Sequence, residues 1–333
     1  DDVRLIAETG GQNAMIVDSS ALPEQVVQDV LSSGFDSAGQ RCSALRILCL
    51  QHDIADQVLA RLKAAMGELA IGNPACLATD IGPVIDEEAQ AQLLAHIEHM
   101  RTKGCAVFQA ALPADCANGC FVPPTLIEIG SLAELQHEVF GPVVHVLRFA
   151  GDQLDRLLAA INATGYGLTR GLHSRIDETV EKVAARVRVG NIYVNRNMIG
   201  AVVGVQPFGG ERLSGTGPKA GGPLYLHRLG GSESVPPDAL GCRHHATAAD
   251  GSRALRRLTA WAGTSGRRDL ARLCASYADL TLRHVRLDLR GSTGERNTLS
   301  FEPRGRLLCL AHDETSLLQQ LAGVLAVDGT ALM

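Results

Sequence analysis

The stretch AMIVDSSALPEQVVQDVLSSGFDSAGQRCSALRILCL (14–50) specifies the fold class. Its first four residues are apolar, and residues 23–35 then repeat apolar side chains with the period of a helix. Pro23 stands near the first turn of that helix, where a proline is well placed. A polar, glycine-containing turn (36–43) leads to a second apolar run with the pattern of a buried strand (45–50). Strand, helix and strand in this order favour a parallel pair of strands.

The same alternation of strand and helix continues beyond this stretch. The sequence predicts further strands over 3–7, 105–109, 125–129, 143–149 and 191–194, and further helices over 54–69, 87–103, 153–162 and 176–187. Alternation over this length is typical of an α/β protein in which helices cover a mostly parallel sheet. The glycine-rich segment 200–223 interrupts the pattern and is predicted to be irregular.

The character of the chain changes after about residue 230. The segment SESVPPDALG (232–241) has the composition of a linker, and an Arg- and Ala-rich helix is predicted over 254–277. Residues 306–333 follow with the pattern strand, helix, strand. We therefore predict one domain over 1–230, and a linker with a smaller, truncated α/β region over 231–333. Because both ends resemble the interior of a domain, we expect the chain to be a piece of a longer protein.

Composition narrows the class of function. The net charge of −5 argues against a nucleic-acid surface, which needs basic side chains to displace counterions. Nine cysteines without regular spacing indicate free thiols in a reducing cytoplasm. The sequence has no apolar run of the length that a membrane span needs. His96 and His99 stand one helical turn apart without a third ligand, so we predict no metal site.

Cys42 is the first candidate for chemistry. It stands in the polar turn GQRCS (39–43) between a predicted helix and a predicted strand, where a thiol can face a cleft. Backbone N–H groups of such a turn can stabilise a thiolate and a developing oxyanion. The alternative is one more buried thiol, and the turn by itself favours neither interpretation.

Three other motifs contain candidate residues. Glu8, before Thr-Gly-Gly at the end of a predicted strand, stands where ligands of open α/β sheets bind and could act as a base; a surface or capping carboxylate is the alternative. EVFGP (138–142) could hold a ribose hydroxyl and a flat ligand, or be an ordinary turn. The run PFGGERLSGTG (207–217) fits neither a Walker loop nor a dinucleotide fingerprint, and a loop that shapes a substrate site explains it better.

Together these motifs resemble the aldehyde dehydrogenase superfamily. The resemblance rests on ETGG (8–11), GQRC (39–42), EVFGP (138–142) and PFGG (207–210) with Ser214-Gly215, in the order and spacing of that family. Longer segments resemble a narrower group, the L-glutamate-γ-semialdehyde (Δ1-pyrroline-5-carboxylate) dehydrogenase module of the bifunctional bacterial proline utilization A family. These segments are GQRCSALR (39–46), YVNRNMIGAVVGVQPFGG (193–210) and LSGTGPKAGGPLY (213–225).

The resemblance implies a fold and a set of roles. The fold would be the parallel-sheet catalytic domain of that family over 1–230, with a smaller α/β C-terminal region. Cys42 would attack the aldehyde carbon, and Glu8 would activate the water that hydrolyses the resulting thioester. Glu138 would hold the nicotinamide ribose of NAD, and Phe140 would pack against the nicotinamide end. The substrate would contact Ser43, Gly200, Ala201 and Phe208.

The resemblance also implies what accompanies this segment. The family's N-terminal half, with the dinucleotide-binding sheet and an oxyanion-hole Asn, would lie outside these residues, so we expect the isolated chain to bind NAD poorly. An FAD-dependent proline dehydrogenase would lie upstream in the same polypeptide. We expect a cytoplasmic homo-oligomer, peripheral at the inner membrane in one form of the full-length protein. Arg212 stands where a small residue is expected.

Two alternatives stay open. A cysteine-dependent acyl hydrolase would need a histidine beside Cys42, and His137 is the nearest candidate by elimination only. A non-enzymatic assembly or lid module suits residues 231–333, which contain no catalytic constellation of their own.

Overall fold

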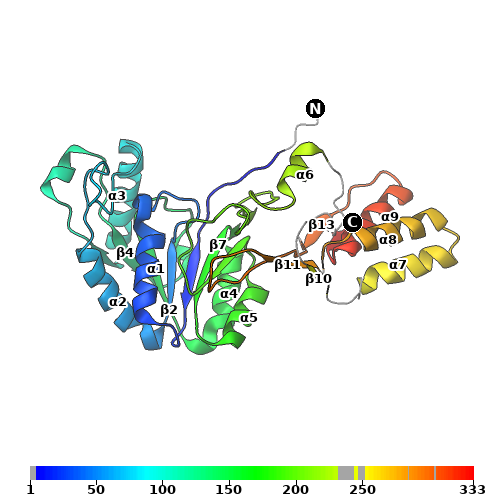
Figure 1. Cartoon of the computed structure of the whole chain (residues 1–333), viewed down its shortest axis with the longest axis horizontal. Helices are drawn as coiled ribbons and strands as arrows, with labels where there is room; N and C mark the ends of the chain where they lie inside the picture. The colour runs from blue at the N-terminus through cyan, green and yellow to red at the C-terminus, as the bar shows by residue number, and fades with distance from the viewer. Residues whose placement is uncertain (1–4, 232–243, 247–251, 284, 304) are drawn as a thin grey trace. The chain divides into compact units, whose positions relative to one another are not determined.

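The structure is a computed structural model that describes residues 5–231, 244–246, 252–283, 285–303 and 305–333 (Figure 1). The chain forms two compact units. The sheet unit comprises residues 5–200 and 208–217, and the C-terminal unit comprises residues 201–207 and the described residues from 218 onwards. The linker predicted over 232–241 lies outside the described residues, and the predicted division at residue 230 stays a prediction.

A seven-stranded sheet forms the centre of the sheet unit (Figure 1). Its strand order is β3-β4-β5-β2-β1-β7-β8, and every neighbouring pair is parallel except β3 and β4. The predicted α/β fold with a mostly parallel sheet is therefore confirmed. The strands are β1 (Ala14–Val17), β2 (Ile47–Gln51), β3 (Ala106–Gln109), β4 (Thr125–Ile129), β5 (Val143–Phe149), β7 (Thr169–His173) and β8 (Asn191–Val194).

Helices flank the sheet on two sides. In Figure 1, α1 and α2 pack side by side on one side, and α4 and α5 lie on the other. The α-helices are α1 (Pro23–Phe35), α2 (His52–Gly67), α3 (Glu87–Thr102), α4 (Leu154–Ala163) and α5 (Asp177–Arg186). Short 3-10 helices are η1 (Asp36–Gly39), η2 (Ala114–Asn118), η3 (Leu132–Glu134) and η4 (Gly151–Gln153). The helix predicted over 23–35 is confirmed, with Pro23 as its first residue.

The central strands are apolar runs because both faces of the sheet are covered. All four residues of β1 are at most 1% exposed, and the first four residues of β2 are equally buried. A strand covered on both faces shows continuous rather than alternating hydrophobicity. Burial of these side chains is the main free-energy gain that holds the sheet and its helices together.

Two elements of the sheet unit differ from the sequence-based expectation. β7 was missed because Thr169, Arg170 and His173 are polar, and such residues rarely fill a buried central strand. All five of its residues are nevertheless buried. The strand predicted over 3–7 is wrong in its described part: residues 5–7 lie in no strand, and Glu8 makes a single antiparallel bridge to Gly215.

The glycine-rich segment is less irregular than expected. A short antiparallel pair, β6 (Tyr166–Gly167) with β9 (Glu211–Arg212), fixes part of it. Arg212 has a φ of +61°, and its Nη1 donates to the carbonyl of Asn162 at 2.7 Å, in the last turn of α4. The guanidinium therefore binds a helix-terminal carbonyl, which gives the arginine a structural role where a small residue was expected.

The C-terminal unit contains small sheets and a group of helices. The single helix predicted over 254–277 is wrong, because Gly266, with a φ of +74°, separates α7 (Arg253–Thr264) from α8 (Arg268–Leu280). The strand–helix–strand pattern predicted over 306–333 is confirmed as β13 (Arg306–Leu308), α9 (Glu314–Ala326) and β14 (Thr330–Leu332). The remaining elements are α6 (Tyr225–Gly230), β10 (His244–Ala246), β11 (Val285–Leu289) and β12 (Asn297–Ser300).

Candidate active site

Three of the four motifs meet at one edge of the sheet. ETGG (8–11) precedes β1, the turn 39–43 precedes β2, and EVFGP (138–142) precedes β5. These three strands are neighbours in the order β5-β2-β1 and run parallel. Because parallel strands begin at the same edge, the three motifs lie together at the amino edge. The expectation that Glu8 ends a strand, where ligands of open sheets bind, is therefore wrong.

The fourth motif, PFGG (207–210), reaches the same edge through two hydrogen bonds. The backbone N–H of Gly209 donates to Asn191 Oδ1 at 3.3 Å, at the start of β8. The backbone N–H of Gly210 donates to Glu8 Oε2 at 2.9 Å. The glycines thus bring a backbone segment about two hundred residues away along the chain against the candidate base.

The turn that carries Cys42 has a strained backbone. Ser37, Ala38 and Gly39 have φ values of 56°, 53° and 66°, all in the left-handed region that non-glycine residues rarely adopt. A Cβ on Gly39 would lie 2.2 Å from the carbonyl oxygen of Gly141, so only glycine fits there. Cys42 lies three residues after Gly39 in the same turn and is exposed. Strain of this kind persists only where the surroundings fix the turn, and it often marks a functional site.

The environment of the thiol opposes its ionisation. Desolvation by the packed atoms around it raises the pKa of the Cys42 thiol, and the charges of Glu138 and Glu8 raise it further. Hydrogen bonds from the backbone N–H groups of Ser43 and of Cys42 itself lower it, but the net shift of the pKa is upward. The backbone donors expected near the thiol are present, although other effects outweigh them.

Two buried polar residues that sequence reasoning missed, Asn13 and Thr169, bind backbone carbonyls of the segment around Cys42. Asn13 is fully buried, and its Nδ2 donates to the carbonyls of Cys42 at 2.6 Å and Ala44 at 2.9 Å. Its Oδ1 accepts the backbone N–H of Thr169 at 3.1 Å. The Thr169 hydroxyl in turn donates to the carbonyl of Ser43 at 3.2 Å. The Asn13 amide therefore uses both donors and its acceptor within the site.

Arg46 is the third residue that sequence reasoning missed. It is 1% exposed and forms an ion pair with Glu138, with 3.2 Å between Nη2 and Oε1. The other oxygen of Glu138 accepts the backbone N–H of Gly11 at 3.0 Å. Desolvation raises the pKa of Glu138, and the Arg46 charge partly opposes this rise. The only local signal for Arg46 is a charged residue directly before an apolar strand.

The predicted cofactor residues lie on the turn before β5 and reach solvent. Phe140 is 45% exposed, and the Cζ atom of Arg46 lies 4.9 Å from its ring centroid. A Cβ on Gly10 would lie 1.8 Å from Glu138 Oε2, so the glycine lets the backbone approach the carboxylate closely. The site thus offers a partly open carboxylate beside an exposed aromatic ring.

The predicted substrate residues are not all part of one unit. Ser43 is buried directly after Cys42, and Phe208 is half-buried in the sheet unit. Gly200 is exposed, with a φ of +71° and open space where a Cβ would point. Ala201 begins the segment 201–207 of the C-terminal unit, so its place in the substrate site stays a prediction.

The histidines do not form a metal site in the described part of the chain. His137, the candidate base of an acyl hydrolase, is exposed. His145 is buried on β5, where its Nε2 lies 2.9 Å from His96 Nε2 and its Nδ1 lies 3.3 Å from the carbonyl oxygen of Arg46. Among the described residues, no group of three or more His, Cys, Asp or Glu could hold a metal ion.

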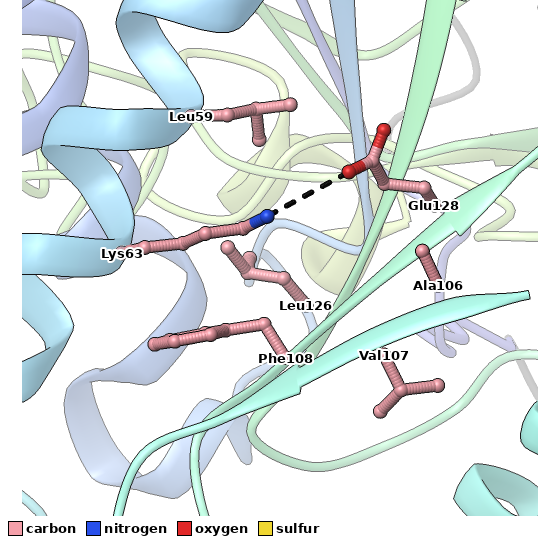
Figure 2. A pocket seen from close by; sticks show the side chains of 7 residues that line it. All are labelled: Leu59, Lys63, Ala106, Val107, Phe108, Leu126 and Glu128. Carbon is pink, nitrogen blue, oxygen red and sulfur yellow. Dashed lines mark ion pairs between the residues drawn. The ribbon is translucent and has the colours of Figure 1, made fainter.

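Two pockets lie away from these motifs. The pocket in Figure 2 lies between α2 and the strands β3 and β4, where Lys63 points towards Glu128, with 3.7 Å between Nζ and Oε1. Its lining residues are Leu59, Lys63, Ala106, Val107, Phe108, Leu126 and Glu128. The second pocket lies at the carboxyl edge and includes Asp18 and Gln51. No cysteine is among the residues that line either pocket, so neither competes with Cys42 as a place for thiol chemistry.

Comparisons with known proteins agree with the sequence motifs. The model of the aldehyde dehydrogenase family matches residues 2–233. A bifunctional protein PutA of Salmonella typhimurium is 57% identical over an alignment of 345 positions, which covers 99% of this chain and 26% of that protein. A 1-pyrroline-5-carboxylate dehydrogenase of Geobacillus kaustophilus is 40% identical over 225 residues, which cover 67% of this chain and 43% of that protein.

Solved structures agree with these relatives. A crystal structure of bifunctional proline utilization A superposes with a TM-score of 0.65 at 58% identity, covering 67% of this chain and 23% of that one. The chain therefore spans about a quarter of the length of the bifunctional relatives. Within the described residues, no helix is long and apolar enough to cross a membrane.

Proposed function

This chain belongs to the aldehyde dehydrogenase family, and we propose that it carries the thiol-bearing part of an NAD-dependent aldehyde dehydrogenase. The aldehyde would be L-glutamate γ-semialdehyde, the open form of Δ1-pyrroline-5-carboxylate, and the product glutamate. The observation that carries the proposal is the meeting of an exposed thiol, Cys42, with the carboxylates Glu8 and Glu138 at the amino edge of one sheet. The names of the relatives support the substrate.

The proposed reaction uses Cys42 as nucleophile and Glu8 as base. The sulfur attacks the aldehyde carbon and forms a hemithioacetal, in which the former carbonyl oxygen carries the negative charge. Loss of hydride from that carbon leaves a thioester on Cys42. Glu8 then takes a proton from the water that hydrolyses the thioester, which releases the carboxylic acid and the free thiol. Because its pKa is raised, Cys42 reacts from a small thiolate fraction at neutral pH.

The residues before β5 fit the nicotinamide-ribose end of NAD. A carboxylate accepts hydrogen bonds at both oxygens, and Glu138 keeps part of its surface open while Arg46 and Gly11 occupy its inner side. The exposed ring of Phe140 offers a flat apolar surface beside it. A bound nicotinamide supplies the acceptor for the hydride. We expect the chain by itself to bind NAD weakly, and tight binding in calorimetry would contradict this.

The substrate proposal assigns the amino-acid end of the semialdehyde to small residues and backbone groups. Ser43, Gly200 and Ala201 would bind its carboxylate and amine, and Phe208 would pack on its aliphatic chain. The exposed, open position of Gly200 supports access for a ligand. We propose NAD as the cofactor, a cytoplasmic homo-oligomer, and an upstream FAD-dependent proline dehydrogenase in the same polypeptide. The word bifunctional in the name of the relatives supports a second activity in that polypeptide.

The decisive experiment replaces the thiol in the complete natural polypeptide that contains this chain. Cys42→Ala is expected to abolish NADH formation from Δ1-pyrroline-5-carboxylate, followed by absorbance. The matched control is Cys76→Ala, which removes another exposed thiol and should leave the rate unchanged. NADH formation by the Cys42→Ala protein would refute the assignment. Hydrolysis of an acyl substrate, without oxidation of the aldehyde when NAD is present, would favour the acyl hydrolase instead.

A further inference from the structure

Arg46 is a buried cation, directly before β2, that the proposed mechanism does not use. Moving a charged side chain out of water costs several kcal/mol unless an opposite charge and a full set of hydrogen bonds compensate. Desolvation accordingly lowers the pKa of Arg46, and the charge of Glu138 opposes this effect. Its neighbours must therefore supply acceptors for the whole guanidinium group.

The guanidinium group uses all five of its N–H donors. Nη1 donates to the carbonyls of Gly39 at 2.7 Å and Gly141 at 3.2 Å. Nη2 donates to the carbonyl of Arg41 at 3.1 Å and to Glu138 Oε1 at 3.2 Å. Nε donates to the same carboxylate oxygen at 3.3 Å. A rigid, planar fork of five donors can bind two backbone turns at once.

The acceptors belong to two different turns of the site. Gly39 and Arg41 lie on the turn that leads to Cys42, and Gly141 and Glu138 lie on the turn before β5. The latter turn also carries Phe140, whose ring stands 4.9 Å from the guanidinium carbon, within the range of a cation–π contact. One side chain thus binds the turn of the nucleophile and the turn of the cofactor-binding acid.

We propose that Arg46 is a positioning residue that fixes the Cys42 turn relative to the Glu138 carboxylate and the Phe140 ring. This inference rests on the proposed function for the roles of Cys42 and Glu138. A positive charge alone cannot fix both turns, because a lysine ammonium has three donors and cannot bind the four acceptor groups at once. Loss of the fork frees the Cys42 turn from the turn before β5, and the strained backbone before Cys42 relaxes.

The first test measures the thiol without any cofactor. Arg46→Lys and Arg46→Met are compared with the unchanged chain in the rate of iodoacetamide alkylation against pH, resolved for each cysteine by mass spectrometry. Relaxation of the turn withdraws the backbone N–H groups of Ser43 and Cys42 from the thiolate. We expect slower alkylation of Cys42 at neutral pH, with a midpoint at higher pH, while Cys76 serves as the unaffected reference.

The matched control is Arg170→Lys. Arg170 is also 1% exposed, and its guanidinium donates to the backbone carbonyls of Gln12, Tyr166 and Thr169, outside both turns. We expect this variant to lower the melting temperature as Arg46→Lys does, but to leave the alkylation profile of Cys42 unchanged. An unchanged profile in both Arg46 variants, or an equal shift in Arg170→Lys, would overturn the inference.

The second test separates this inference from the proposed function. In the complete natural polypeptide, Arg46→Lys should raise KM for NAD and lower kcat on the order of tenfold to a hundredfold, as expected for misplaced reacting groups. If the unchanged polypeptide forms no NADH from Δ1-pyrroline-5-carboxylate, the proposed function fails, and the alkylation profile still decides whether Arg46 fixes the Cys42 turn. Normal KM and kcat in Arg46→Lys would refute the positioning role alone.

Discussion

The two edges of the parallel sheet are built from the same strands but use their polar groups differently. At the carboxyl edge, Asp18 accepts the hydroxyl of Ser20 at 2.6 Å and its backbone N–H at 2.8 Å, and it also binds the hydroxyl of Ser174. Asn195 exchanges two hydrogen bonds with the backbone of Ser174, at 3.0 and 2.9 Å. These polar groups form hydrogen bonds with one another.

At the amino edge, buried polar side chains instead bind the backbone of the turns, and the reactive groups on these turns stay exposed. Asn13 and Arg46 bind carbonyls of the turn that carries Cys42, while the thiol and the Phe140 ring reach solvent. Buried polar residues therefore serve stability at the carboxyl edge and the geometry of a reactive turn at the amino edge. Changes at the amino edge should accordingly affect activity as well as stability.

The largest expected effect is that of Glu8→Gln in the complete natural polypeptide. Without the carboxylate, hydrolysis of the thioester should slow by roughly 10² to 10⁴ while hydride transfer continues, because general-base catalysis contributes about that factor. Rapid-mixing absorbance should then show one burst of NADH followed by a stall. Asp18→Asn, at the carboxyl edge, should lower stability and leave both steps unchanged. Equal slowing of both steps in Glu8→Gln would contradict the assigned role.

Asn13→Leu should cause the largest loss of stability at either edge. It leaves the buried carbonyls of Cys42 and Ala44 and the N–H of Thr169 without their partner. Each unsatisfied buried group costs about 1–3 kcal/mol, so we expect a loss of about 2–4 kcal/mol after relaxation. Urea unfolding of the chain measures this loss. Asn195→Gly, at an exposed position of the carboxyl edge, should cost about 1 kcal/mol. Equal losses in the two variants would contradict the difference between the amino and the carboxyl edge.

Acid should lower the stability of the folded chain through two buried histidines, one near each edge of the sheet, and the two effects should differ in size. Desolvation lowers the pKa of His145 to about 3 and that of His173 to about 4. Below the ordinary pKa of 6.5, only the unfolded chain binds these protons, so each histidine removes about 1.4 kcal/mol of stability per pH unit as the pH falls towards its folded value.

Asp29, 3.3 Å from His173, has the opposite dependence, because desolvation raises its pKa to about 6. Between about pH 4 and 6 the folded state keeps the proton of this acid, and the stability it contributes is lost as the pH rises. We expect His145→Gln to flatten the fall of the melting temperature in acid more than His173→Gln does, because burial lowers the pKa of His145 further than that of His173. Equal flattening by the two variants would contradict this difference.

Gly39→Ala tests whether the reactive turn tolerates any side chain. The new methyl group would lie 2.2 Å from the carbonyl of Gly141 and would also meet an unfavourable φ of +66°. We expect a loss of about 1–3 kcal/mol, together with slower alkylation of Cys42. Gly104→Ala has a φ of +87° but open space, so it should cost about 1 kcal/mol and leave the thiol unchanged. Similar losses of stability in the two variants would show that the contact with the Gly141 carbonyl does not cause the loss in Gly39→Ala.

Arg212→Gly should have the smallest effect. The change removes the bond to the Asn162 carbonyl but relieves a non-glycine residue with a φ of +61°. Each contribution is about 1 kcal/mol and the signs are opposite, so the free energy of unfolding should stay within about 0.5 kcal/mol. A larger loss would mean that the cap on α4 supports the loop beside Glu8.

Much of the fold could be predicted from the sequence, because hydrophobic periodicity records the environment of each element locally. The bounds of α1, β4, β5 and β8 agree with the predicted ranges, and strand–helix alternation predicts the parallel sheet. β7 could not be predicted, because its polar residues are buried only through partners elsewhere, such as the Gln12 carbonyl that accepts from Arg170. The candidate site residues Cys42, Glu8 and Glu138 come from ordered motifs, and their roles stay predictions.

The amino-acid sequence alone indicated which polar, glycine-flanked turns deserve a chemical interpretation. That these turns share the amino edge follows only from the folded chain, because the order β5-β2-β1 brings together motifs separated by about a hundred residues. Asn13 and Arg46 acquire their importance in the same way. The sequence does not show which acceptor a buried donor will bind, because the acceptor lies far away along the chain and is brought close only when the strands pair.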